Sequence, residues 1–190
     1  MRALTVETGR PDSLAMTEVP DPVAGPGELL VEGLAVGVCA TDREIIAAEY
    51  GEAPPGEHRL VIGHESLGRV VSAPDDSDFA SGDHVVGVVR RPDPEPCGAC
   101  ARGLFDMCRN GRYTERGIKG VDGFASQRWT VPTEYAVKCR RGLANSLFSS
   151  NPRRCWRKRG TRSTPWEIDR GSPQKRSWSP VPAPSVSWAR

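Results

Sequence analysis

Two groups of residues in this 190-residue chain have side chains that could bind a metal ion. The first group is Cys39, at the end of a strand-like segment, with the adjacent pair His64 and Glu65. Zinc favours thiolate and imidazole, and a catalytic site takes three protein groups and keeps a position for water or substrate. The cation would ease loss of a proton from a bound alcohol. The residues alone leave a second interpretation open, because a single cysteine after a strand is more often a small buried residue, and His64 could be structural.

The second group is the segment CGACARGLFDMC, which places Cys97, Cys100 and Cys108 within twelve residues. In a cytosolic chain, such clustering favours metal binding over a disulfide framework. A closed structural zinc site takes four ligands, so three thiolates would need a further oxygen or nitrogen donor. A zinc-filled site and an empty loop are both compatible with this pattern.

The elements that must position these residues are short and separated by Gly and Pro. MRALTVE and SLAMTEVP predict an opening pair of strands, and GPGELLVEGLAVGVC predicts a turn and a long strand ending at Cys39. TDREIIAAE predicts a short helix with Thr41 or Asp42 near its N-cap. LVIGHESLGRVV and GDHVVGVV predict further strands. This pattern favours a mainly β fold with short helices, an irregular barrel, over an open βαβ sheet.

The charge of the chain divides it into two parts. Residues 1–138 hold 14 Lys and Arg against 22 Asp and Glu, whereas residues 139–190 hold 12 against 2. Four of the five tryptophans also fall in residues 139–190, here called the tail. A break this sharp predicts a domain boundary close to Lys138.

The order of the motifs in residues 1–138 resembles a known family. GVCATD, GHESLGRVV, GDHVVGVV and the cysteine cluster follow one another as in the N-terminal GroES-like domain of zinc-dependent medium-chain alcohol dehydrogenases. VCATDREI, GLFDMCRNG, TERGIKGVDGFAS and EYAVK resemble the glucose 1-dehydrogenase branch of that family. The resemblance runs from Met1 to Lys138 and implies a GroES-like irregular β-barrel, the zinc-binding catalytic domain.

The resemblance also implies a role for individual residues. Cys39, His64 and Glu65 would hold the catalytic zinc, and Thr41 would hydrogen-bond the reacting hydroxyl and help to pass its proton outward. Glu115 would accept hydrogen bonds from other sugar hydroxyls. Without the resemblance, a solvated loop carboxylate is an equally good interpretation of this residue. The family's structural zinc lobe has four cysteines, so Cys97, Cys100 and Cys108 correspond to a lobe shortened by three residues with one ligand lost.

The activity implied by the resemblance is the oxidation of glucose or a related aldose at C1 to the lactone, with NAD(P) as acceptor. That acceptor needs a Rossmann domain, and the sequence contains no G-x-G-x-x-G loop. No cofactor-binding residue is therefore assigned, and the chain alone is expected to be inactive. Oligomers of the family use the cofactor domain, so no oligomer is assigned either.

The basic, Pro-, Ser- and Trp-rich tail is predicted to be disordered or poorly ordered, and SWSPVPAPSVSWAR has no apolar period that a sheet or helix could use. Its codons permit another protein in one shifted reading frame. FSSNPRRCWRKRG permits VLLEPTSVLAKAW, with glutamate in the slot of Asn151, and WSPVPAPSVSWAR permits VVTGAGPVGLLGA. The second contains the dinucleotide fingerprint. The tail therefore reads as a frame-shifted remnant of a Rossmann domain.

Two other functions are weighed against this one. The basic tail with Trp156, Trp166, Trp178 and Trp188 could bind single-stranded nucleic acid through phosphates and base stacking, which the frame-shift interpretation disfavours. The barrel could instead be a non-catalytic binding module.

The N-terminus lacks a secretory h-region, and no stretch approaches the roughly 20 apolar residues that cross a membrane. A cytoplasmic protein is expected.

Overall fold

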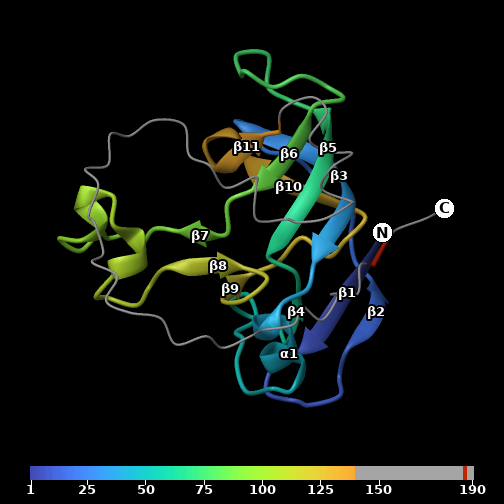
Figure 1. The fold of residues 1–190 in the computed structure, drawn as a ribbon, viewed down its shortest axis with the longest axis vertical. Coiled ribbons are helices and arrows are strands. Elements are labelled where there is room, and N and C mark those ends of the chain that lie inside the picture. The colour runs from blue at the N-terminus through green and yellow to red at the C-terminus, as the bar shows by residue number, and fades with distance from the viewer. Residues whose placement is uncertain (140–185, 188–190) are drawn as a thin grey trace, which may run out of the picture.

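The structure is a computed structural model that describes residues 1–139 and the two-residue strand at 186–187. Within these residues the chain is mainly β, with one short α-helix and three 3-10 turns (Figure 1). The strands are β1 (Arg2–Glu7), β2 (Ala15–Glu18), β3 (Glu28–Gly37), β4 (Arg59–Val61), β5 (Glu65–Ser72), β6 (His84–Gly87), β7 (Arg90–Arg91), β8 (Thr114–Arg116), β9 (Gly120–Val121), β10 (Arg128–Pro132), β11 (Ala136–Lys138) and β12 (Val186–Ser187). The helix is α1 (Ala40–Ile46), and the 3-10 turns are η1 (Cys100–Arg102), η2 (Phe105–Met107) and η3 (Thr133–Tyr135).

These strands form three sheets. The largest has the order β10-β3-β5-β6-β11 with antiparallel neighbours, and β12 pairs with β3 beside this path. A second sheet has the order β2-β1-β4, and a small third one the order β7-β8-β9. The pairing of β3 with β5 carries two register shifts, which strengthen the local twist and let the sheet curl. The predicted mainly β fold with short helices is confirmed.

Two apolar clusters fill the curled sheets. One lies where β1, β3, β4 and α1 meet, and the other lies between β3, β5, β6 and β10. Burial of alternate residues along β3, such as Leu29 and Val31, follows the two-residue period of a strand with one face on the core. The members of the first cluster are Val6, Val36, Ile45, Leu60, Ile62, Ile118 and Ala125. Those of the second are Leu29, Val31, Val70, Val85, Phe124, Trp129 and Val131.

The start of the helix differs from the prediction. The segment TDREIIAAE predicted a helix from Thr41, with Thr41 or Asp42 near its N-cap. The helix α1 begins one residue earlier, at Ala40, with Cys39 as the N-cap and Thr41 and Asp42 in the first turn. The reason is that the Asp42 carboxylate reaches back and accepts the Cys39 N–H at 2.8 Å, which satisfies one donor at the start of the helix. The opening strands, by contrast, pair as predicted, with Arg2 opposite Glu18.

Most of the tail, which was predicted to be disordered or poorly ordered, lies outside the described residues. The exception is β12, in which Val186 pairs with Val36 and Ser187 with Ala35 on β3. The sequence pattern did not predict this two-residue strand. Strand pairing joins backbone groups and can proceed without an apolar side-chain period.

Candidate functional site: two clusters of metal-ligating side chains

The antiparallel pairing of β3 and β5 brings the first predicted group together. Cys39 follows the last residue of β3 by two positions, and His64 and Glu65 stand where β5 begins. Gly37 on β3 is directly opposite Glu65 on β5, so the end of one strand meets the start of the other. The sulfur, an imidazole nitrogen and a carboxylate oxygen of the three residues all lie within 4.8 Å of one another.

Two glycines make room for this arrangement. A Cβ at Gly37 would overlap the Glu65 carboxylate, so a larger residue would displace that side chain. Gly63, directly before His64, has a φ of +90°, a conformation that suits glycine. A Cβ at Gly63 would also lie 2.7 Å from Val36 Cγ2. The glycine of the GHE motif is therefore required by the backbone turn and by the core beneath it.

The two ring nitrogens of His64 face different partners. Nε2 lies 3.1 Å from Cys39 Sγ, toward the cluster. Nδ1 lies 3.4 Å from Asp42 Oδ1 and has no closer partner among the described residues, so this contact is long for a hydrogen bond and acts mainly as a charge pair. Asp42 is 1% exposed. Its carboxylate therefore holds both the Cys39 backbone and the His64 ring from behind the cluster.

The charge state of His64 gives the metal-free protein a pH dependence. Burial lowers the pKa of His64, but the interaction with the Asp42 carboxylate, followed by that with Cys39, outweighs burial and raises the pKa to about 9. A folded-state pKa above the unfolded value adds stability that is complete below about pH 6.5 and is lost as the pH rises through about 9. We expect the free energy of unfolding, measured by urea denaturation with a chelator present, to fall across that interval. Asp42→Asn should flatten the fall and the exposed control Glu44→Gln should keep it; an equal slope in all three proteins contradicts the assignment.

The other two predicted residues stand on neighbouring elements. Thr41 is in the first turn of α1, two residues after Cys39. Glu115 is on β8 and is mostly buried, with Arg90 Nη2 2.6 Å and Arg90 Nε 3.0 Å from its Oε1. Because both bonds go to Oε1, neither occupies Oε2. An isolated parallel β-bridge pairs the backbones of Glu52 and Lys119. It joins the segment after α1 to the β8–β9 turn, so α1 and β8 lie on the same side of the molecule (Figure 1).

The second predicted group also comes together, in the segment between β7 and β8 that extends away from the large sheet (Figure 1). The sulfurs of Cys97, Cys100 and Cys108 all lie within 4.8 Å of one another, and all three are free thiols. Backbone N–H groups, first that of Arg109 and then that of Cys100, lower the pKa of Cys97 to about 6. Burial and the neighbouring sulfurs raise the pKa of Cys100 to about 11.

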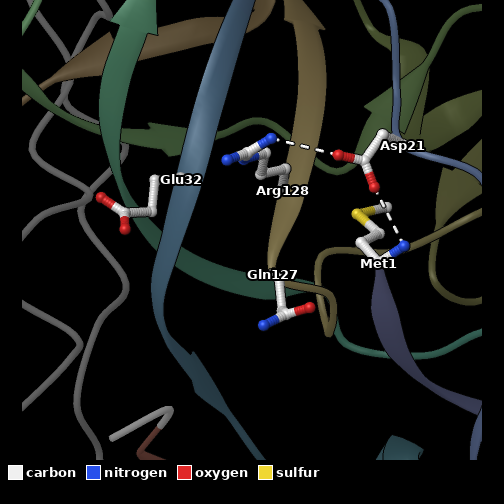
Figure 2. A pocket seen from close by; sticks show the side chains of 5 residues that line it. All are labelled: Met1, Asp21, Glu32, Gln127 and Arg128. Atoms are coloured by element: carbon white, nitrogen blue, oxygen red, sulfur yellow. Dashed lines mark hydrogen bonds and ion pairs between the residues drawn. The ribbon is translucent and has the colours of Figure 1, made fainter. Parts of the chain in front are cut away.

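A cavity of about 230 Å³ lies elsewhere, lined by Met1, Asp21, Glu32, Gln127 and Arg128. Figure 2 shows the Met1 amino group and the Arg128 guanidinium both directed at Asp21. The two ion pairs have N–O distances of 2.9 and 3.1 Å. Glu32 pairs with Arg69. The charges lining this cavity are thus paired with protein groups, and none of the predicted site residues lies in it.

The donor set of the first cluster fits zinc. A thiol sulfur, an imidazole nitrogen with its second nitrogen held by a carboxylate, and a carboxylate oxygen converge on one point. Sequence reasoning missed Asp42 and Arg90 as the residues that hold His64 and Glu115. An acidic residue three positions after an N-cap cysteine was a signal for Asp42, whereas no local pattern pairs Arg90 with Glu115, 25 residues later.

Residues 25–141 match the alcohol dehydrogenase GroES-like domain. The chain belongs to this family. A glucose 1-dehydrogenase from Thermoproteus tenax is 42% identical over 153 residues, which cover 80% of this chain and 42% of that protein. One from Methanocella arvoryzae is 44% identical over 138 residues, covering 72% and 38%. The GroES-like family expected from the motifs is confirmed. Both of these relatives are glucose 1-dehydrogenases, the branch that the motifs resemble.

A solved structure supports the same relationship for this GroES-like domain. Haloferax mediterranei glucose dehydrogenase, in complex with NADP, Zn and gluconolactone, aligns with a TM-score of 0.69 and 42% identity, over 78% of this chain and 41% of that one. The chain thus spans about two fifths of the length of the relatives it matches. No helix in the part of the chain that the structure describes is long and apolar enough to cross a membrane.

Proposed function

We propose that Cys39, His64 and Glu65 hold a catalytic zinc ion and that residues 1–138 are the zinc-binding catalytic domain of an NAD(P)-dependent dehydrogenase. The reaction is the oxidation of glucose or a related aldose at C1 to the lactone. The convergence of the three ligand atoms within 4.8 Å carries this proposal. The zinc, NADP and gluconolactone bound by the Haloferax mediterranei relative support it. A zinc ion held by these three residues would lower the pKa of a bound substrate hydroxyl.

The chain's own residues would position the sugar and move its proton. The Thr41 hydroxyl, one helical position beyond Ala40, hydrogen-bonds the reacting C1 hydroxyl and passes its proton toward solvent. Glu115 accepts a hydrogen bond from another sugar hydroxyl through Oε2, while Arg90 fixes the other oxygen. A site built to bond several hydroxyls discriminates strongly against substrates that lack them.

The nicotinamide acceptor requires a domain that we assign to a second reading frame of the gene. The tail codons permit both VLLEPTSVLAKAW and a G-x-G-x-x-G loop in one shared frame. The reading frame would then change just after the boundary near Lys138. The alternative of nucleic-acid binding by the tail rests on Trp156, Trp166, Trp178 and Trp188, all outside the described residues.

The decisive experiment is to sequence the encoding DNA across codons 130–190 and beyond, and then to express two proteins. One is the 190-residue chain, and the other follows the shifted frame after Cys139. We expect glucose-dependent reduction of NAD(P)+ from the frame-restored protein and none from the 190-residue chain. The control is Thr41→Val in the frame-restored protein, which should lower kcat by about 100-fold or more because general acid–base steps contribute that much.

Two results would overturn the proposal. A stop codon soon after residue 190 in the shifted frame removes the Rossmann assignment and makes the tail genuine protein. A frame-restored protein that folds and binds NAD(P) but oxidises no aldose removes the substrate assignment and leaves the GroES-like domain as a binding module. Zinc content, measured in parallel, reports on the metal assignment separately from either outcome.

A further inference from the structure

The cysteine cluster has one buried neighbour that the family resemblance does not use. Asp93, four residues before Cys97, is 2% exposed, and its Oδ2 lies 3.9 Å from Cys108 Sγ. Its position is fixed from the other side, because Oδ1 accepts the Glu95 N–H at 2.8 Å. Oδ2 therefore faces the Cys108 sulfur. The half-exposed Arg112 Nε lies 3.4 Å from the same oxygen, and the Asn110 side chain also interacts with the Asp93 carboxylate.

The sulfurs are already spaced as metal ligands. Cys97 Sγ and Cys100 Sγ are 3.7 Å apart. Two thiolates on a tetrahedral zinc with bonds of about 2.3 Å lie about 3.8 Å apart. The Arg109 N–H also donates to Cys97 Sγ at 3.4 Å, the kind of outer hydrogen bond that holds a ligand in place. What the cluster lacks is a fourth donor.

The local chain explains why the donor comes from the N-terminal side. After Cys100, η1 ends at Arg102 and is followed by its C-cap Gly103, whose φ is +77°; η2 then leads directly to Cys108. No cysteine stands in that turn. On the entry side, the PDPEPC segment alternates proline with acidic residues, so restricted backbone angles carry Asp93 into the buried position beside Cys108.

We propose that Asp93 is the fourth ligand of a structural zinc site formed with Cys97, Cys100 and Cys108. Its carboxylate replaces the thiolate that the shortened lobe has lost. Zinc uptake releases the thiol protons, and the thiol of Cys108 that faces Oδ2 exchanges its proton for the metal. Arg112 and the Glu95 N–H then act as the outer partners that orient the carboxylate. This site is independent of the proposed activity.

The test is a cobalt titration of the full chain in a His64→Ala background, which disables the other cluster. Cobalt reports coordinating thiolates through charge-transfer bands. Asp93→Ala should weaken cobalt and zinc binding at the lobe by at least about 100-fold, since even outer-shell losses cost 10–100-fold. Asp93→Cys should raise the charge-transfer intensity by about one third, because four thiolates replace three. Asp106→Asn, an exposed acidic residue of the same lobe, should change neither.

The cysteine substitution keeps the proposal testable even if Asp93→Ala fails to fold. An Asp93→Cys protein whose cobalt spectrum equals that of the parent overturns the proposal, because position 93 then does not face the metal. A parent chain that binds no cobalt in the lobe also overturns it. Loss of zinc from the Cys39 cluster alone leaves this result unaffected and counts only against the proposed catalytic site.

Discussion

Replacing His64 with alanine is expected to remove one equivalent of zinc from the protein and to weaken binding at the Cys39 cluster by at least about 100-fold. The imidazole supplies the only nitrogen donor of this cluster, and its Nε2 lies 3.1 Å from Cys39 Sγ. Without it, a thiol and a carboxylate remain, fewer than the three protein groups of a catalytic zinc site. Elemental analysis after dialysis against a weak chelator measures the change.

The matched control is His58→Ala, which alters an exposed histidine six residues earlier in the chain. It should keep the full zinc content, and Cys39→Ser should reproduce the loss seen with His64→Ala. Circular dichroism of each variant separates metal loss from unfolding. Equal zinc in His64→Ala and in the parent would contradict the catalytic-site assignment.

Replacing Phe124 with alanine is expected to destabilise the domain by about 3–5 kcal/mol, the range for removing a large buried aromatic side chain. Phe124 is 2% exposed and contacts the Trp129 ring edge-on, with 4.8 Å between centroids. The Arg116 guanidinium lies 4.8 Å from the same ring centroid, so truncation also removes this cation–π contact, while the hydrogen bond of Arg116 to the Thr130 carbonyl remains. A loss of this size is a large fraction of the 5–15 kcal/mol that stabilises a typical domain.

Urea denaturation measures this loss in the metal-loaded and the metal-free protein. Because the Phe124 N–H bonds the Gly63 carbonyl at 2.8 Å, next to His64, we expect weaker zinc binding to accompany the lower stability. The control Val23→Ala changes a residue that is 89% exposed and should stay within about 0.5 kcal/mol of the parent. A Phe124→Ala protein as stable as this control would show that the second apolar cluster does not hold the domain together.

Local patterns were enough to predict the strands that carry the site. The alternation in ELLVEGLAVG and the Gly-His-Glu turn predicted β3 and the start of β5, because both depend on neighbours close in sequence. The ligand types of Cys39, His64 and Glu65 followed from their chemistry. The motif order identified the family, and that resemblance, more than any spacing, selected these residues from the other cysteines and histidines.

The exact N-cap and the contact of Asp42 with the His64 ring could not be predicted in the same way. Thr41 and Asp42 were placed near the N-cap by residue type, but the cap itself is Cys39, because Asp42 holds both the cysteine backbone and the His64 ring. That double role depends on β5 lying against the end of β3. Sequence spacing alone does not show that the Asp42 carboxylate will contact both the Cys39 N–H and the His64 ring, because His64 is 22 positions later in the chain.

The sequence by itself determined the donor chemistry of both clusters, the mainly β class and the break in charge near Lys138, since these follow from residue type and short-range pattern. Only the tertiary structure decided which distant groups meet: Gly37 opposite Glu65, Arg90 on Glu115, and Asp93 beside Cys108. The physical reason is register. A strand pairing fixes contacts between residues tens of positions apart, and a shift of one residue would send each side chain to the other face.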